Sequence, residues 1–166
     1  MLETDRLFLR RPQSSDFEAF AQMFRETEVT QHIGGNLSRA DAWARLLRDC
    51  GHWALEGFGQ FTIIEKASGA YVGKTGFAKY ERDLGPKAKA SVETSWTFRS
   101  GFQGLGYARE ACRAAQSWYD DRVGGPTACL IAERNTSSRR LAAHLGYGEV
   151  DKFARPDGTV IVLRRG

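Results

Sequence analysis

A glycine-rich turn, Gly101-Phe-Gln103-Gly104-Leu-Gly106-Tyr-Ala108, connects a strand pattern to a helix pattern in the second half of the chain. Residues 90–98 before it alternate as a strand does, and the helical pattern after it continues to about residue 122. A helix that begins at such a turn has free backbone N–H groups at the positive end of its dipole, and these can bind phosphate. Gly104 and Gly106 would let the backbone approach the phosphate oxygens closely. The alternative is a tight turn that needs glycine and binds nothing.

Two nucleotide-binding motifs match this turn poorly. A Walker loop needs a lysine after its last glycine, and no lysine follows Gly104 or Gly106. A Rossmann fingerprint that starts at Gly104 needs a third glycine where this chain has Arg109, and it follows the first strand of its domain rather than a later one. The sequence therefore favours neither motif.

The helix after the turn carries a stripe of small residues, which would let it lie close to a sheet. The stripe consists of Ala108, Ala111, Cys112 and Ala115, and the residues expected to face solvent are Arg109, Arg113, Gln116 and Asp120. The apolar run 129–132 then predicts a strand that is covered on both faces. A strand-helix-strand connection of this kind pairs its two strands in parallel.

The rest of the chain predicts mainly antiparallel strands. Strands are expected at 6–10, 60–66, 71–80, 147–153 and 159–164, a loop at 27–37, a turn at 155–158 and a helix at 135–145. Two more helices follow the caps Ser14-Ser-Asp16 and Ser38-Arg-Ala-Asp41, with apolar stripes of Phe17, Phe20, Ala21 and Phe24 and of Ala42, Trp43, Leu46 and Leu47. This order predicts one α/β (α+β) domain over residues 1–166, with a mixed, mostly antiparallel sheet and helices on both faces.

The strand before the turn has two different faces. Val92, Thr94, Trp96 and Phe98 are expected on one face, and Glu93, Ser95 and Thr97 on the other. The mixed polar face predicts the wall of a cleft.

The composition excludes several classes of protein. The 24 Lys and Arg against 20 Asp and Glu leave a net charge of +4, which is too small for a nucleic-acid-binding arm. No apolar run is long enough to span a bilayer, and the acidic start does not resemble a signal peptide. Cys50, Cys112 and Cys129 are too widely spaced for a disulfide framework or a zinc site, and the three histidines are scattered too. We expect a metal-free cytoplasmic protein with no membrane or nucleic-acid partner.

Three motifs resemble the GNAT N-acetyltransferase superfamily. Gln103-Gly-Leu-Gly106-Tyr-Ala108 matches every fixed position of its acyl-CoA motif, in which Gln or Arg, Gly, and Gly or Ala are spaced in this way. The opening Glu3-Thr-Asp-Arg-Leu-Phe-Leu-Arg10, and Asn135-Thr-Ser-Ser138-Arg-Arg140 followed by Leu145-Gly-Tyr147, resemble the branch that contains the ribosomal-protein N-acetyltransferases. The order of elements is also similar, so the resemblance covers essentially the whole chain.

The resemblance implies acetyl-CoA as a co-substrate. In this family the strands that correspond to 90–98 and 127–132 splay apart, the pantetheine arm lies between them, and the pyrophosphate lies on the loop. Carried over, the cofactor-binding residues are Trp96, Thr97, Phe98, Gln103, Gly104, Leu105, Gly106, Tyr107, Ala108, Asn135 and Arg139, with Arg99 and Arg109 as further candidates for the 3′-phosphate.

The reaction needs a neutral amine, whereas a lysine amine has a pKa near ~10.4 and an α-amine near ~8, so a general base helps. Several relatives place a catalytic glutamate at the position of Glu93; the alternative is an ion pair with a nearby lysine. The leaving thiolate, with a pKa of about 8.5, needs less help from an acid. Many relatives have a tyrosine for this where the chain has Ala142.

Members of this branch instead offer the serine that corresponds to Ser138, whose alternative role is a cap or backbone hydrogen bond. Asn135 is expected to position the cofactor or the acceptor through its side-chain amide. A backbone N–H of the strand near Trp96 or Thr97 is expected to donate a hydrogen bond to the developing oxyanion.

The acceptor pocket is expected from residues 27–37, the second helix and residues 81–89. Glu26 and Glu28 could attract a cationic amine weakly, and His32 is interpreted as solvated.

The predicted function is acetyl transfer to a primary amine, which belongs to a protein N-terminus or to a small molecule. The acetyl group is expected to move directly to the amine within a ternary complex, and the protein is expected to be a monomer or a homodimer. The alternative is a non-catalytic CoA-binding or ribosome-binding module with this fold. An RNA-binding domain would need a basic stripe with interleaved aromatic residues, which the sequence lacks.

Overall fold

The structure, a computed structural model, describes residues 1–156 and 158–166. Its strands are β1 (Leu2–Glu3), β2 (Leu7–Arg10), β3 (Gln60–Glu65), β4 (Tyr71–Ala78), β5 (Val92–Phe98), β6 (Thr127–Ala132), β7 (Gly148–Arg155) and β8 (Gly158–Arg165). Its helices are α1 (Phe17–Met23), α2 (Thr27–Thr30), α3 (Arg39–Glu56), α4 (Tyr107–Arg122) and α5 (Thr136–His144), with 3₁₀ turns at Ser14–Asp16 and Ser100–Phe102.

The described strands form one mixed sheet in the order β1-β2-β3-β4-β5-β6-β8-β7. Neighbouring strands are antiparallel except β5 and β6, which are parallel, as the strand-helix-strand connection through α4 requires. The predicted fold class is therefore confirmed. The two residues of β1, Leu2 and Glu3, pair with Leu9 and Phe8 of β2, which the sequence pattern did not indicate.

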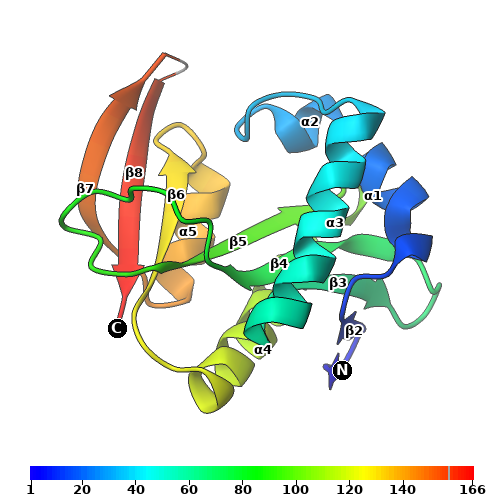
Figure 1. Cartoon of the computed structure of the whole chain (residues 1–166). Helices are drawn as coiled ribbons and strands as arrows, with labels where there is room; N and C mark the ends of the chain where they lie inside the picture. Colours follow the sequence, from blue (N-terminus) through cyan, green and yellow to red (C-terminus); the bar gives the residue numbers. More distant parts are fainter. Residues whose placement is uncertain (157) are drawn as a thin grey trace.

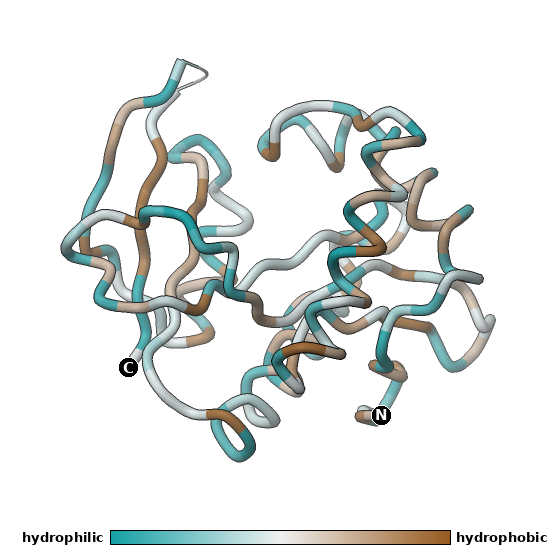
Figure 2. Tube along the Cα trace, viewed as in Figure 1, coloured by the Kyte–Doolittle hydropathy of each residue, from teal (hydrophilic) through white to brown (hydrophobic). Residues whose placement is uncertain are grey.

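Helices cover both faces of this sheet (Figure 1). On one face α1 and α3 enclose a cluster that includes Phe20, Phe24 and Leu46. On the other face, α4 packs on the sheet over a larger cluster that includes Phe77 and Tyr119, whose rings stack with centroids 4.1 Å apart. Figure 2 shows the apolar middle of β8 as a brown stretch within the sheet.

Helix α3 begins where the sequence predicts. The Ser38 hydroxyl oxygen accepts a hydrogen bond from the backbone N–H of Asp41 at 3.1 Å, and Gly57 ends the helix with a φ of 75°. The predicted apolar stripe is only half correct, because Trp43 and Leu47 are exposed. The buried face continues instead through Asp49 and Trp53, since an ion pair with Lys74 of β4 lets Asp49 occupy a buried position.

Two further expectations are wrong. Residues 27–30 form a helical turn, α2, within the segment expected to be a loop, because the N–H groups of Thr30 and Gln31 bond to the carbonyls of Glu26 and Thr27. Gln116, expected to face solvent, is buried, and its side-chain oxygen accepts a hydrogen bond from the Tyr147 hydroxyl at 3.0 Å.

Strands β7 and β8 form the predicted hairpin. β7 covers Gly148–Arg155 where 147–153 was expected, and β8 covers Gly158–Arg165 where 159–164 was expected. Of the turn expected at 155–158, Asp157 lies outside the described residues. None of the described helices combines the length and the apolar character needed to cross a membrane.

Candidate active site

A cavity of about 600 Å³ opens where β5 and β6 separate. The described pairing of these strands consists of Val92 with Thr127 and Glu93 with Ala128. Beyond those pairs, residues 94–97 of β5 and 129–132 of β6 line the cavity. Strands 90–98 and 127–132 therefore splay apart, as the sequence comparison implied.

The other walls come from the regions that were expected to form the acceptor pocket. They include residues 32–34 of the segment after α2, Arg45 and Arg48 of α3, and residues 79–82 after β4. In Figure 1, α2 and α3 lie toward the right of the view, and β6 with the β7–β8 hairpin lies toward the left. Neither Glu26 nor Glu28 is among the described lining residues.

The register between β4 and β5 fixes the direction of each side chain on β5, because directly paired residues point to the same side of a sheet. Thr97 pairs with Lys74, whose ammonium contacts Asp49 of α3, so Glu93, Ser95 and Thr97 face α3. Trp96 pairs with Thr75, whose hydroxyl lies 3.2 Å from the sulfur of Cys112 in α4. The two predicted faces of this strand are thus present.

Glu93 is buried, with 3% of its surface exposed, and it lines the cavity. Its carboxylate is bound by both ends of one guanidinium: Arg82 Nε donates to Oε1 at 2.7 Å, and Arg82 Nη2 donates to Oε2. The ion pair that the sequence offered as an alternative is present, although the cation is Arg82 rather than a lysine. Each carboxylate oxygen retains a lone pair that can accept a further proton or hydrogen bond.

Asn135 and Ser138 lie on the opposite wall, at the start of α5. The Asn135 side-chain oxygen caps the helix by accepting a hydrogen bond from the Ser138 N–H at 3.1 Å. The Ser138 hydroxyl oxygen accepts a hydrogen bond from Trp96 Nε1 at 3.2 Å. Asn135 rather than Ser138 is therefore the capping side chain. Ala142, at the position where many relatives have a tyrosine, is buried.

The glycine-rich loop follows the end of β5 and leads into α4. Gln103 Nε2 donates to the carbonyl oxygen of Phe98 at 3.0 Å, which anchors the loop to the strand. Gly104 and Gly106 have φ values of 77° and 82°, a region that side chains rarely adopt. A Cβ atom at Gly104 would meet no atom within 4 Å, so this face of the loop is open.

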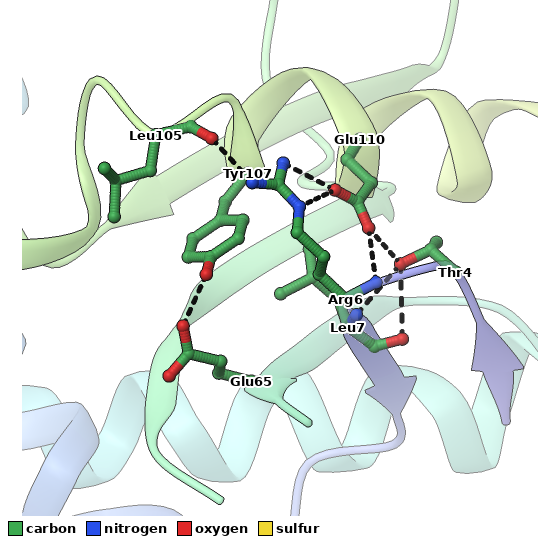
Figure 3. Close-up of polar contacts among 7 residues, drawn as sticks. All are labelled: Thr4, Arg6, Leu7, Glu65, Leu105, Tyr107 and Glu110. Atoms are coloured by element: carbon green, nitrogen blue, oxygen red, sulfur yellow. Dashed lines mark hydrogen bonds and ion pairs between the residues drawn. The ribbon is translucent and has the colours of Figure 1, made fainter. Parts of the chain in front are cut away.

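A polar network holds this loop from the N-terminal strands (Figure 3). Arg6 Nη1 donates to the carbonyl oxygen of Leu105 at 2.9 Å, and its guanidinium lies 4.3 Å from the centroid of the Tyr107 ring. Glu110 of α4 accepts hydrogen bonds from Arg6 Nε at 2.8 Å and from the Thr4 hydroxyl at 2.6 Å. Burial alone would raise the pKa of Glu110, but these hydrogen bonds outweigh burial and lower it.

Sequence reasoning did not assign this role to Thr4 and Arg6. The available signal was that the opening segment and the loop motif resemble the same branch of one family. The network gives a physical reason for their joint occurrence, since the first residues of the chain support the loop.

The candidate residues thus fall into two groups. The described residues that line the cavity include Glu93, Trp96, Thr97, Asn135 and Ser138, whereas Phe98, Gln103, Gly104, Leu105, Gly106, Tyr107, Ala108 and Arg139 do not line it. Arg139 pairs with Glu149 at 2.7 Å. Arg99 pairs with Glu26, which also accepts hydrogen bonds from Ser100, so Glu26 is engaged outside the pocket.

Comparison with known proteins agrees with this geometry. The family model for the acetyltransferase (GNAT) domain matches residues 6–148. The chain belongs to the GNAT acetyltransferase family. It is accordingly an N-acetyltransferase.

Solved GNAT structures have the same fold. An acetyltransferase from Bordetella pertussis, described as GNAT-family, is 30% identical, with a TM-score of 0.88 and 99% and 98% of the two chains covered. An acetyltransferase from Agrobacterium tumefaciens is 25% identical, with a TM-score of 0.83 and coverage of 99% and 93%. A ribosomal L7/L12 α-N-protein acetyltransferase in complex with coenzyme A is 15% identical, with a TM-score of 0.78 and coverage of 98% and 94%, and shows the fold alone.

Proposed function

We propose that this GNAT protein transfers an acetyl group from acetyl-CoA directly to a primary amine, and that residues 1–166 make up one catalytic domain. The observation that carries this proposal is the opening between β5 and β6, with Glu93 on one wall and Ser138 on the other. The acceptor is a small-molecule amine or a protein N-terminus. A cytoplasmic location and a monomeric or homodimeric state stay predictions.

The residues present fit coenzyme A. The open face of the loop at Gly104 and the free N–H groups at the start of α4 suit a pyrophosphate. In this proposal Gln103, Gly104, Leu105, Gly106, Tyr107 and Ala108 hold the pyrophosphate, Trp96, Thr97, Phe98 and Asn135 position the pantetheine arm, and Arg139 reaches the 3′-phosphate from its pair with Glu149. Acetyl-CoA supplies the activated acetyl thioester.

Glu93 is the proposed proton acceptor for the attacking amine. Its carboxylate is fixed by Arg82, and its remaining lone pairs can accept the proton directly or through a water molecule. Ser138 is the proposed donor to the leaving sulfur. Its hydroxyl oxygen accepts a hydrogen bond from Trp96, which leaves its own proton available to donate.

The cysteine on the cavity wall supports direct transfer rather than an acyl-enzyme. Cys129 lines the cavity, but burial raises the pKa of its thiol. A thiol that stays protonated near neutral pH is a poor nucleophile.

Titration with acetyl-CoA and measurement of thiol release with a panel of amines test the proposal. Saturating CoA should raise the melting temperature, because a ligand at ~100 times its dissociation constant stabilises the folded state by about 2.7 kcal/mol. NAD at the same concentration should have no effect. Binding of CoA without thiol release for any amine would favour the non-catalytic module, and stabilisation by NAD alone would contradict a CoA site.

A further inference from the structure

The wall of the cavity formed by α3 carries two arginines, Arg45 and Arg48, which we call the arginine pair. Residues three apart on a helix lie on neighbouring positions of one face, so both guanidinium groups approach the cavity from the same side. Lys74 of β4 lines the cavity beside them. All three cations lie on the side of the sheet that α3 covers, and the side chain of Glu93 points to the same side.

The arginine pair lacks an acidic partner within the described residues. The carboxylate of Asp49, which is 3% exposed, is held by Lys74. Asp41 accepts a hydrogen bond from the Ser38 hydroxyl. Neither arginine takes part in an ion pair with any described residue, so no carboxylate contacts either guanidinium directly, although the charges of Asp49 and Asp41 act on Arg45 from farther away.

The acids that line the cavity do not balance this charge. Glu93 is bound by Arg82, and Glu81 is exposed. Burial lowers the pKa of Arg45, and the neighbouring charge of Arg48 lowers it further, so the two cations repel each other where water is partly excluded. An anion between them would relieve this repulsion.

Aromatic rings hold the two guanidinium groups in place. Arg45 lies 4.8 Å from the centroid of the Phe24 ring, and Arg48 lies 5.0 Å from that of Tyr80. A guanidinium stacked on a ring keeps its N–H groups free in its own plane, where they match a carboxylate. The carbon of the Arg82 guanidinium lies 5.5 Å from the centroid of the same Tyr80 ring, which connects the arginine pair to Glu93.

This position separates the arginine pair from the loop proposed for the pyrophosphate. Lys74 points toward α3, whereas Thr75 beside it contacts Cys112 of α4 on the opposite face of the sheet. Helix α4, whose N-terminal N–H groups are proposed to bind the pyrophosphate, therefore packs on the other side of the sheet. An anion bound by the arginine pair belongs to the acceptor rather than to the acyl donor.

We infer that the acceptor is an amine that also carries a carboxylate, that Arg45 and Arg48 bind this carboxylate, and that the amine then lies beside Glu93. The inference rests on the proposed acetyl transfer and names the class of its acceptor. Arg45 and Arg48 act here as specificity-determining residues.

Matched acceptors that differ in one charge test this inference. Two arms separate the sources of a carboxylate: 4-aminobutyrate against 4-aminobutanamide, and the C-terminally amidated peptide Ala-Glu-Ala against Ala-Gln-Ala. We expect the carboxylate member of at least one pair to have a kcat/KM roughly ten- to hundred-fold higher, the range expected for a charge-assisted hydrogen bond. Arg48→Gln and Arg45→Gln should abolish that preference by lowering kcat/KM for the carboxylate member toward that of the carboxamide member.

Arg39→Gln is the matched control, because it removes the same charge from α3 at a residue that pairs with Glu18 outside the cavity. Equal kcat/KM for both members of each pair, or a preference that persists in Arg45→Gln and Arg48→Gln, would overturn the inference while acetyl transfer stands. Failure of the proposed function appears separately, as absence of thiol release with every acceptor. In that case calorimetric titration of the Ala-Glu-Ala peptide into the wild-type protein and Arg48→Gln decides: weaker binding to the variant supports the arginine pair, and equal or absent binding overturns it.

Discussion

Glu93 has one guanidinium bound across both of its carboxylate oxygens, which distinguishes it from an unpaired general base. Arg82 restricts the carboxylate to one orientation, with its free lone pairs directed away from the ion pair. Residues that catalyse proton transfer are effective when their orientation is fixed in this way. The ion pair is therefore compatible with a catalytic glutamate.

Replacement of Glu93 by glutamine tests its role as the base. We expect Glu93→Gln to leave CoA binding intact and to lower kcat by roughly 10²–10⁴. The loss should decrease as the pH rises, because more of the amine is already neutral. The measurement is kcat against pH on a variant shown to be folded by circular dichroism; an unchanged rate at every pH would make Glu93 a structural residue.

Ser138→Ala should lower the rate less than Glu93→Gln does, and its effect should have a different pH dependence. A thiolate with a pKa of about 8.5 can leave unprotonated, so we expect a loss of roughly ten-fold or less. High pH should not restore the rate, since no deprotonation is being replaced. A loss as large as that of Glu93→Gln with the same pH dependence would show that the two residues act on one proton.

At the scale of elements, the loop between β5 and α4 depends on strand β2 and the segment before it. Arg6 contacts the loop through the carbonyl of Leu105, and the first turn of α4 through the ring of Tyr107 and the carboxylate of Glu110. An isolated surface ion pair contributes little to stability, but here three contacts from one side chain join the loop to the first turn of α4. We interpret Arg6 as a positioning residue.

Arg6→Gln should therefore weaken cofactor binding more than it slows the chemical step. We expect the Kd for CoA to rise by roughly three- to thirty-fold, with kcat at saturation nearly unchanged, because the hydrogen bonds from Arg6 to Leu105 of the loop and to Glu110 of α4 are lost. Lys66→Gln is the control, since Lys66, the residue directly after β3, pairs with Glu3 of β1 at 2.7 Å. Identical CoA affinity for Arg6→Gln and the wild-type protein would remove this role.

The elements themselves were predictable, but the polar contacts between them were not. Alternation at 90–98 and helical spacing to about residue 122 are local patterns, and the structure has a strand at Val92–Phe98 and a helix at Tyr107–Arg122. Buried polar residues depend on partners distant in the sequence, such as Lys74 for Asp49 and Tyr147 for Gln116. For the same reason local patterns could not identify Arg82 as the partner of Glu93 or Arg45 and Arg48 as neighbours of the cavity.

At the scale of the whole molecule, a buried carboxylate connects the first strands to the helices above them. Asp16 accepts hydrogen bonds from Arg10 Nη1, the Gln13 N–H and the Thr62 hydroxyl, each at 2.9 Å. Burial alone would raise the pKa of Asp16, but these hydrogen bonds outweigh burial and hold it below its ordinary value.

The lowered pKa makes global stability depend on pH in a defined direction. An aspartate whose pKa is lower in the folded state stabilises the protein fully above its unfolded pKa of ~3.9, and this stabilisation is lost as the pH falls through the folded pKa. We expect Asp16→Asn to reduce the free energy of unfolding by roughly 2–4 kcal/mol at neutral pH. In urea titrations the difference from the wild-type protein should shrink below about pH 4; a difference that stays constant on acidification would contradict the ionised form as its source.

The separation of β5 from β6 affects how cooperatively the two parts of the sheet unfold. Strands β6, β8 and β7 connect to the other five through two residue pairs, whereas β6 and β8 are paired along all six residues of β6. Native proteins open locally along boundaries with few hydrogen bonds. The amide hydrogens on the two sides of this boundary should therefore exchange at different rates, through local opening that requires less free energy than global unfolding. A ligand that bonds to the strand edges on both sides would join the two parts, and occupancy of the cleft would then slow exchange throughout the C-terminal strands rather than only at the residues it contacts.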